Sequence, residues 1–204
     1  MNLNQVINVC TVLLSGIGTL LEIFFITLVL ALPLGLIVAL ARNSKCKILS
    51  WIMKNYILLI RGTPMILQII IVYFCPYYLF NVTYDRFLAI IIAFTINYAA
   101  YFGEIFRSGI ESIPKGQWEA AFTLGFNKTK TFFLIVLPQA IKRTLPAISN
   151  EVITLVRDTS LAQVIGITEL FSIAQKQANF KFSIIPLIAA GVIYLIISFY
   201  YSSL

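Results

Sequence analysis

The chain has 204 residues, of which 60% are hydrophobic and only 11% are charged. A soluble fold of this size cannot bury that much apolar surface, so the composition excludes a soluble globular domain. The net charge of +7 does not indicate a nucleic-acid partner, because the cations gather beside long apolar segments in the pattern of a membrane protein. We therefore expect an all-α, polytopic membrane protein.

Apolar runs of about 20 residues, long enough to cross roughly 30 Å of hydrocarbon as helices, recur along the chain. We predict five transmembrane helices that form a single transmembrane domain over residues 1–204. In the first of them, Pro33 and Gly35 indicate either a kink or close helix packing. The approximate spans are 16–41, 56–80, 87–106, 148–167 and 182–204.

Basic residues are distributed unevenly among the predicted loops. Ten lie between spans one and two or between spans three and four, and three lie on the opposite side. The positive-inside rule therefore places the two basic segments in the cytoplasm and the N-terminus outside. No Lys or Arg precedes Arg42, so we expect the first span to be retained and not cleaved as a signal peptide. The ten are Arg42, Lys45, Lys47, Lys54, Arg107, Lys115, Lys128, Lys130, Lys142 and Arg143, and the three are Arg86, Lys176 and Lys181.

The second span carries polar residues on both sides of a predicted break. Pro64 lacks an N–H, so the carbonyl of Ile60 loses its helical partner. Irregular backbone at membrane depth is tolerated where it lines a cavity, so a helix broken at residues 62–64 can offer polar groups to a substrate. Gln68 and Arg61 are candidates for this pathway. Arg61 alternatively lies near the inner edge of the membrane and extends its guanidinium to water.

Two polar stripes follow in the third and fourth spans. Asn97, Tyr101 and Glu104 recur at helical spacing in the third span. In the fourth, Glu151 and Asp158 are seven residues apart, which places them within about 20° on one helix face. Ionisable side chains inside a membrane are costly and mark pathways, so the stripes predict a shared polar cavity.

Some of these polar residues could instead form ion pairs away from any cavity. Glu104 can pair with Arg107 within its own helix, and Glu151 can pair with basic residues at the inner surface. Asp158 and Arg157 lie deeper and are harder to explain without a partner, and for Asp158 we favour a functional role. An amino acid requires a cation near its carboxylate and acceptors near its ammonium group, and the stripes supply both without identifying a particular substrate.

A polar segment of about 37 residues, 107–143, separates spans three and four. Ser112 can cap a short helix over residues 114–124 with Pro114 in its first turn, and Gly125 is a typical left-handed stop. Asn127 can cap a second helical stretch that runs to Leu137 and ends at Pro138. The short helix either rests on the inner face of the membrane or docks in the groove of a partner protein.

The spacing within this segment resembles the EAA loop of ABC-importer permeases. Glu119-Ala120-Ala121 is followed after three residues by Gly125, and then after nine residues by Ile135, one further residue and Leu137-Pro138. Other stretches are similar to the polar amino-acid permease subfamily, and the resemblance covers nearly the whole chain. They are Arg61 to Pro64 (RGTP), Asn97 to Arg107 (NYAAYFGEIFR), Ser112 to Gln117 (SIPKGQ) and Thr159 to Leu161 (TSL).

The resemblance implies a type I importer permease with short cytoplasmic coupling helices, located in the bacterial cytoplasmic membrane. Arg157 stands where the family often has Lys, and the sequence given lacks the family's usual basic tail after Leu204. The residues implied for coupling to an ATPase are Pro114, Gly116, Glu119, Ala120, Ala121, Gly125, Leu137 and Pro138. The residues expected along the substrate pathway are Arg61, Thr63, Gln68, Asn97, Tyr101, Glu104, Glu151, Asp158 and Ser160.

The implied partners are ATP-binding subunits, a second permease chain that is identical or related, and an extracytoplasmic substrate-binding protein. The chain has no P-loop of its own, because Asn127 stands directly before Lys128 in the nearest candidate, GFNKT at residues 125–129. ATP and Mg²⁺ are therefore expected on the partner ATPase, with no cofactor, metal or catalytic residue on this chain.

Two other functions compete with the importer. A secondary transporter driven by an ion gradient would also use a broken helix and buried carboxylates, but it predicts an inverted internal repeat, and five spans do not divide into equal halves. An intramembrane enzyme is disfavoured because the chain contains no His and no paired catalytic residues in its spans.

Overall fold

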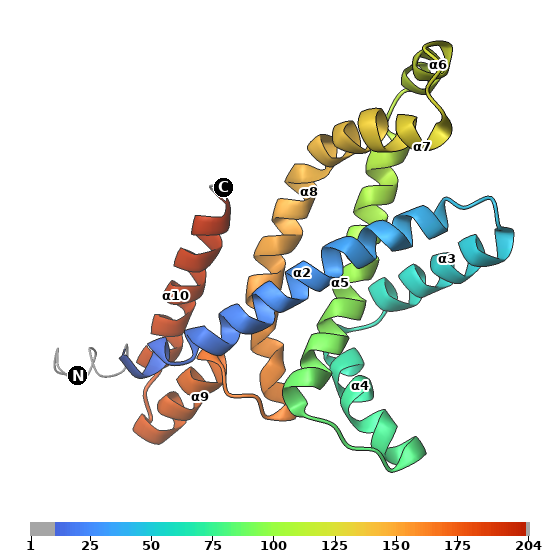
Figure 1. Cartoon of the computed structure of the whole chain (residues 1–204). Coiled ribbons are helices and arrows are strands. Elements are labelled where there is room, and N and C mark those ends of the chain that lie inside the picture. The colour runs from blue at the N-terminus through green and yellow to red at the C-terminus, as the bar shows by residue number, and fades with distance from the viewer. Residues whose placement is uncertain (1–10, 203–204) are drawn as a thin grey trace.

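The structure, a computed structural model, describes residues 11–202, and its regular secondary structure over that range consists of helices with no strands (Figure 1). The predicted all-α membrane fold is confirmed. Residues 1–10, and therefore the predicted placement of the N-terminus, lie outside the described part, as do the last two residues of the fifth predicted span.

Two long helices, α2 (Ile17–Arg42) and α5 (Arg86–Glu111), form the centre of the fold. They pack closely because glycines face the contact on both sides. A Cβ atom on Gly35 would lie 2.6 Å from the Cβ of Phe102, and one on Gly103 would lie 2.7 Å from a methyl group of Val38. Close packing is thus the role of Gly35, one of the two alternatives that the sequence left open.

The second predicted span is a pair of helices, α3 (Lys47–Gly62) and α4 (Met65–Phe80), bent by 110°. The break falls at Thr63 and Pro64, as predicted. Helix α3 begins at Lys47, well before the predicted edge at Tyr56. Helix α3 is amphipathic, so a search for continuous apolar residues places its start too late.

The polar segment forms α6 (Lys115–Thr123) and α7 (Lys128–Thr131), after which the π-helical turn η1 (Phe132–Val136) leads into α8 (Leu137–Asp158). Asn127 caps α7 as predicted, since its side chain accepts a hydrogen bond from the Lys130 N–H at 2.9 Å. The predicted stop at Pro138 is wrong. Proline there lies in the first turn of α8, where a missing N–H costs little, and the helix continues.

The predicted cap at Ser112 is also wrong. Its hydroxyl donates to the carbonyl of Gly109 at 2.7 Å, at the end of α5, and α6 starts after Pro114 without a side-chain cap. The turn that follows α6 does use Gly125 with a positive φ of 81°, as predicted.

After α8 come the 3₁₀ helix η2 (Thr159–Ile165), the short α9 (Leu170–Lys181) and α10 (Ile185–Ser202). The fourth predicted span, residues 148–167, is divided between α8 and η2. Helix α9 lies in a stretch between the fourth and fifth predicted spans, and it packs against α10.

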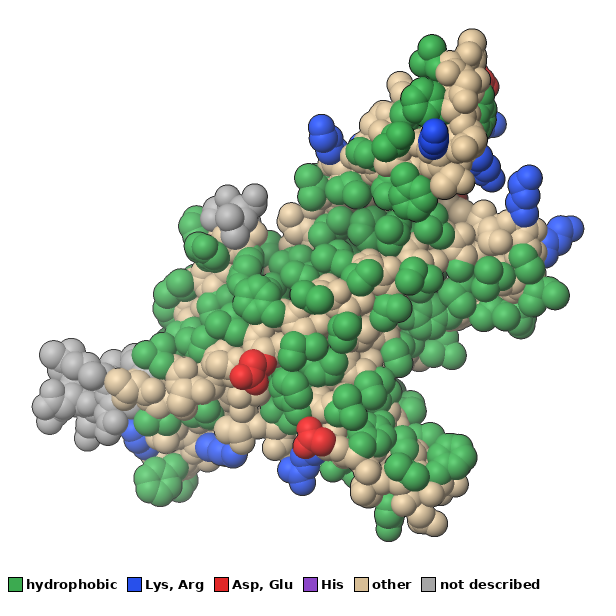
Figure 2. Space-filling model, viewed as in Figure 1, with side chains coloured by type: hydrophobic (Ala, Val, Ile, Leu, Met, Phe, Trp, Pro, Cys, Tyr) green, Lys and Arg blue, Asp and Glu red, His purple; other side chains and the backbone are tan. Residues whose placement is uncertain are grey.

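Three helical stretches of the described chain are each long and apolar enough to cross a membrane, and α3 with α4 makes a fourth if the bent pair is one span. A shorter apolar helix covers Ile185–Tyr201. Apolar side chains cover much of the visible surface, and basic side chains gather near α6 and α7 and at the opposite end of the molecule (Figure 2). This distribution is that of a membrane protein.

Candidate functional site

A polar cavity of about 190 Å³ lies where the break before α4 meets α5 and α8. It brings together one residue of the break and both predicted polar stripes, so the shared cavity expected from the sequence is present. Glu104, which was expected in the stripe of α5, does not line it. The lining residues are Thr63, Met65, Asn97, Tyr98, Tyr101, Glu151, Thr154 and Asp158.

Tyr98 holds the carboxylate of Asp158 in this cavity. Its hydroxyl donates to Oδ2 of Asp158 at 2.7 Å, while its ring is buried in the core beside Phe94 and Phe102. Tyr98 was not among the predicted site residues, because a tyrosine within an apolar run reads as core. The available signal was its position next to Asn97, at the edge of the polar stripe.

Gln68 and Asn97 form a buried amide network at the break. The side-chain NH₂ of Gln68 donates to the carbonyl of Ile60 at 2.8 Å, and to the carbonyl and hydroxyl of Thr63 at 3.1 and 2.9 Å. Asn97 in turn donates to Oε1 of Gln68 at 2.9 Å. The carbonyl that Pro64 leaves without a helical partner is thereby satisfied. Gln68 takes part in this network and does not line the cavity. Asn97 takes part in the network and also lines the cavity.

Arg61 lies at the edge of the cavity. Its guanidinium carbon is 5.2 Å from the ring centre of Tyr101, a cation–π distance, and the side chain is exposed. Tyr101 lines the cavity, so Arg61 contacts the cavity wall without lining the space itself.

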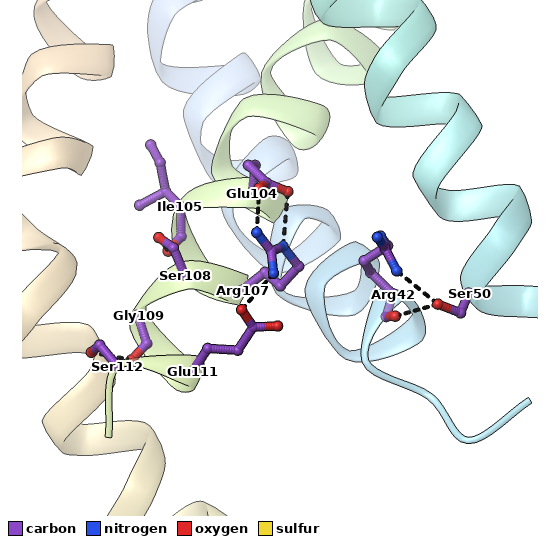
Figure 3. Close-up of polar contacts among 9 residues, drawn as sticks. All are labelled: Arg42, Ser50, Glu104, Ile105, Arg107, Ser108, Gly109, Glu111 and Ser112. Carbon is purple, nitrogen blue, oxygen red and sulfur yellow. Dashed lines mark hydrogen bonds and ion pairs between the residues drawn. The ribbon is translucent and has the colours of Figure 1, made fainter. Parts of the chain in front are cut away.

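Glu104 belongs to a separate ion-pair cluster at the end of α5 (Figure 3). Arg107 pairs with Glu104 at 2.5 Å and with Glu111 at 2.6 Å. The intrahelical pair was the alternative role for Glu104, and it is the one that the structure shows. Nearby, Arg42 at the end of α2 and Ser50 in α3 exchange hydrogen bonds of 2.8 and 2.7 Å, which closes the loop between these helices.

Two further residues named from the sequence form hydrogen bonds within their own turn. Ser160 donates its hydroxyl to the carbonyl of Arg157 at 2.8 Å within the turn from α8 to η2. Arg157 itself is exposed and donates to Thr154 at 3.2 Å. Neither residue lines the polar cavity.

Helix α6 projects at one end of the molecule (Figure 1). Glu119, Ala120 and Gly116 are exposed on it, and Leu124 at its end is 75% exposed. Ala121, by contrast, is only 1% exposed, so it faces the body of the protein and anchors the helix.

The rest of the segment supports α6 from below. A small apolar cluster of Ile113, Val136 and Ala140 packs with Trp118 and Phe132 beneath it. Leu137 lies half-buried next to this cluster, while Pro114, Gly125 and Pro138 are exposed. Arg143 of α8 donates to the carbonyl of Ser112 at 2.5 Å, which ties the entrance of the segment to α8.

Glu169 is a buried carboxylate that is not conspicuous in the sequence. It caps α9 by accepting from the N–H groups of Phe171 and Ser172, both at 2.7 Å, and Tyr194 of α10 donates to it at 2.9 Å. Burial raises the pKa of the Glu169 carboxyl, and these hydrogen bonds partly offset the rise. The available signal was the Glu-x-x-Ser spacing of a capping box at residues 169–172.

No group of three or more His, Cys, Asp or Glu side chains within residues 11–202 could hold a metal ion.

A helical membrane protein with a broken span, a polar cavity at the break and a projecting polar helix has the architecture of an importer permease. The chain belongs to the family of binding-protein-dependent transport system inner membrane components, whose pattern matches residues 31–204. It is a permease subunit of an ABC importer, and the comparisons support this function and not an ion-gradient-driven transporter.

Curated relatives are similar over most of the chain. The L-cystine transport system permease protein TcyB of Bacillus subtilis (strain 168) is 42% identical over 190 residues, which cover 92% of this chain and 81% of that protein. The arginine transport system permease protein ArtQ of the same organism is 38% identical over 186 residues, which cover 91% of this chain and 85% of that protein.

Solved structures of ABC transporters have a fold similar to that of this chain. A chain of an amino acid ABC transporter with histidines superposes with a TM-score of 0.89 at 30% identity, covering all of this chain and 95% of that one. A chain of the inward-facing MetNI methionine ABC transporter has a TM-score of 0.73 at 16% identity, over 99% of this chain and 94% of that one, and shows the fold alone.

Proposed function

We propose that the chain carries polar amino acids across the bacterial cytoplasmic membrane, and that the cavity beside Asp158 is part of their pathway. The observation that carries the proposal is this cavity, where the Asp158 and Glu151 carboxylates face one small space. Carboxylates suit the ammonium group of an amino acid, and the Arg61 guanidinium over Tyr101 is placed for its carboxylate. The names of the relatives, which include L-cystine and arginine, support an amino-acid substrate.

The proposed energy source is ATP hydrolysis on separate ATP-binding subunits, which would hold the ATP and Mg²⁺. The projecting helix α6, with its exposed Glu119 and Ala120, is the proposed contact with them. A second permease chain and an extracytoplasmic substrate-binding protein complete the proposed importer, with the N-terminus outside and α6 in the cytoplasm. The family description, an inner membrane component of a binding-protein-dependent system, supports this assembly.

The coupling contact is tested by co-purification and ATPase activity. The chain should co-purify with an ATP-binding protein, and Glu119→Lys should lower the substrate-stimulated ATPase rate about tenfold, as expected for the loss of about 1.4 kcal/mol at a contact. Asn55→Lys is the matched control, because Asn55 is exposed on α3 and its side chain donates to the carbonyl of Trp51 in the same helix. Uptake that continues without ATP and follows a proton or sodium gradient would contradict the proposal.

The cavity is tested separately by Asp158→Asn, which keeps the shape of the side chain and removes its charge. Amino-acid uptake should fall about tenfold or more, because the ammonium group loses an ionic partner in a desolvated space. Asp85→Asn is the control, since Asp85 caps α5 away from the cavity and asparagine caps equally well. Unchanged uptake in Asp158→Asn would remove this residue from the pathway while leaving the coupling contact untouched.

A further inference from the structure

A second hollow lies on the same side of the molecule as α6 and is separate from the polar cavity. It is a groove of about 820 Å³ between the end of α2 and the segment that contains α6, α7 and η1, with Ile110 of α5 at its base. One wall is formed by Leu40, Asn43, Ser44 and Lys45, and the other by Trp118, Phe122, Lys128, Thr129, Phe132 and Phe133.

The lining combines apolar surface with positive charge. Phe122 and Phe133 are 47% and 53% exposed, so large aromatic rings remain uncovered in the groove. Each wall contributes one lysine, Lys45 or Lys128, and no Asp or Glu lines the groove. Among the described residues, neither lysine forms an ion pair with a carboxylate. The groove therefore offers two free cations above an apolar floor.

The groove lies at the level where the apolar part of the molecule ends. Helix α2 carries no charged residue between Glu22 and Arg42, and Lys45 follows in the loop. Figure 2 shows apolar side chains below the α6–α7 end of the molecule and lysine or arginine side chains around that end. Lipid headgroups occupy this boundary in a bilayer, with acyl chains on the apolar side.

We infer that this groove binds an acidic phospholipid of the inner leaflet, with the phosphate between Lys45 and Lys128 and an acyl chain against Phe122 and Phe133. The positive charge of the two lysines favours one class of lipid headgroup over another. Two unpaired cations attract the net negative headgroup of phosphatidylglycerol, while the choline group of phosphatidylcholine cancels the charge of its own phosphate. A lipid held there would touch both the loop after α2 and the base of α6.

Trp118 provides a probe inside the groove. The chain has two tryptophans, and Trp51 is exposed on α3, so Trp51→Phe removes the other signal. The permease is purified with its ATPase and placed in nanodiscs of phosphatidylcholine that contain a small fraction of brominated phosphatidylglycerol or brominated phosphatidylcholine. The fluorescence that disappears with the additional substitution Trp118→Phe defines the contribution of Trp118 in the complex.

Brominated phosphatidylglycerol should quench Trp118 at lower mole fraction than brominated phosphatidylcholine. Lys45→Ala and Lys128→Ala should each reduce this preference roughly fivefold, the factor expected for one basic residue near an anionic lipid. The control pair Lys54→Ala and Lys142→Ala removes two exposed cations that do not line the groove, and should keep the preference.

Equal quenching by the two brominated lipids in the chain with both lysines would overturn the inference, and this comparison needs no lysine variant to fold. An unchanged preference after removal of both groove lysines would overturn it as well. Mass spectrometry of the detergent-purified complex gives a second reading: retained phosphatidylglycerol should be lost from the Lys45→Ala/Lys128→Ala double variant and kept in the control pair.

Discussion

Gln68 and Asn97 maintain the bend between α3 and α4 through hydrogen bonds. A proline-broken helix leaves carbonyl groups without donors, and in a membrane these groups cannot turn to water. Gln68 supplies donors to the carbonyls of Ile60 and Thr63, and Asn97 holds Gln68 in place from α5. Because Asn97 also lines the cavity, the same network sets the position of the cavity wall.

Gln68→Met should therefore destabilise the protein more than its small change of volume implies. It leaves two carbonyl groups and the Asn97 amide without a partner, at a cost of about 1–3 kcal/mol for a buried group. Thermal unfolding in detergent measures the effect. Gln163→Met, at a half-buried position in η2, should shift the free energy of unfolding by less than about 0.5 kcal/mol. Equal shifts in both variants would show that the network contributes no special stability.

Glu169 should make the stability of the protein depend on pH. Burial raises its pKa in the folded protein above the ordinary value of 4.5, so the folded state holds the proton more tightly than the unfolded chain does. The tighter proton binding adds to the free energy of unfolding at pH values below 4.5. This contribution is lost as the pH rises through the raised pKa. Glu169→Gln should flatten this part of the curve of melting temperature against pH, and Asp85→Asn, at an exposed helix cap, should leave it unchanged. A curve that keeps its slope in Glu169→Gln would contradict the assignment.

At the scale of elements, the fold depends on how closely α2 and α5 approach each other. Gly35 and Gly103 face one another across this contact, and Gly109 of α5 meets Thr144 of α8 in the same way, since a Cβ there would overlap a methyl group of Thr144. Helix α5 thus packs on both neighbours through small residues, as helices in membranes commonly do. Both sides of the polar cavity are built on helices positioned by these contacts.

Gly35→Ala should disrupt this arrangement. The added methyl group meets Phe102 and its backbone at distances that neither helix can relieve without moving, and overpacking of this kind costs about 1–3 kcal/mol. The measurement is the melting temperature together with amino-acid uptake, both of which should fall. Gly18→Ala on the same helix is the control, because a Cβ at Gly18 meets nothing within 4 Å and alanine is the better helix former. A stabilised Gly35→Ala variant would show that the contact between α2 and α5 can accommodate the added methyl group.

At the scale of the whole molecule, the distribution of charge predicts the orientation of the protein in the membrane. The exposed Cys46 is in the basic loop after α2, and the exposed Thr83 precedes α5 at the other end of the bent pair. Both α6 and the lipid groove lie on the side of Cys46, so their partners depend on this orientation.

Labelling with a membrane-impermeant maleimide tests the orientation. With Cys10 and Cys75 replaced by serine, Cys46 should react only after spheroplasts are permeabilised, because the positive-inside rule predicts that its basic loop lies in the cytoplasm. Thr83→Cys, in a chain that also carries Cys46→Ser, should react in intact spheroplasts. The reverse pattern would place α6 outside, where it could not meet a cytoplasmic ATPase.

Several features of the fold and site were predictable from the sequence because they have local causes. An apolar run long enough to span hydrocarbon is visible in the chain itself, as is a break at a proline or a stop at Gly125. The class of protein followed from the resemblance of residues 119–138 to the EAA loop of ABC-importer permeases, and the family match supports it. Polar stripes at helical spacing likewise predicted the cavity between α5 and α8.

Only the tertiary structure decided which polar residue serves which purpose. Glu104 and Asp158 look alike in the sequence, yet one pairs with Arg107 at the end of α5 and the other lines the cavity beside Tyr98. Gln68 donates to a carbonyl group left free by the broken helix, and Glu169 is a buried cap of α9. The physical reason is that the burial and hydrogen-bond partners of a side chain depend on helices distant in sequence, whereas hydrophobicity and turn preference belong to the residues themselves.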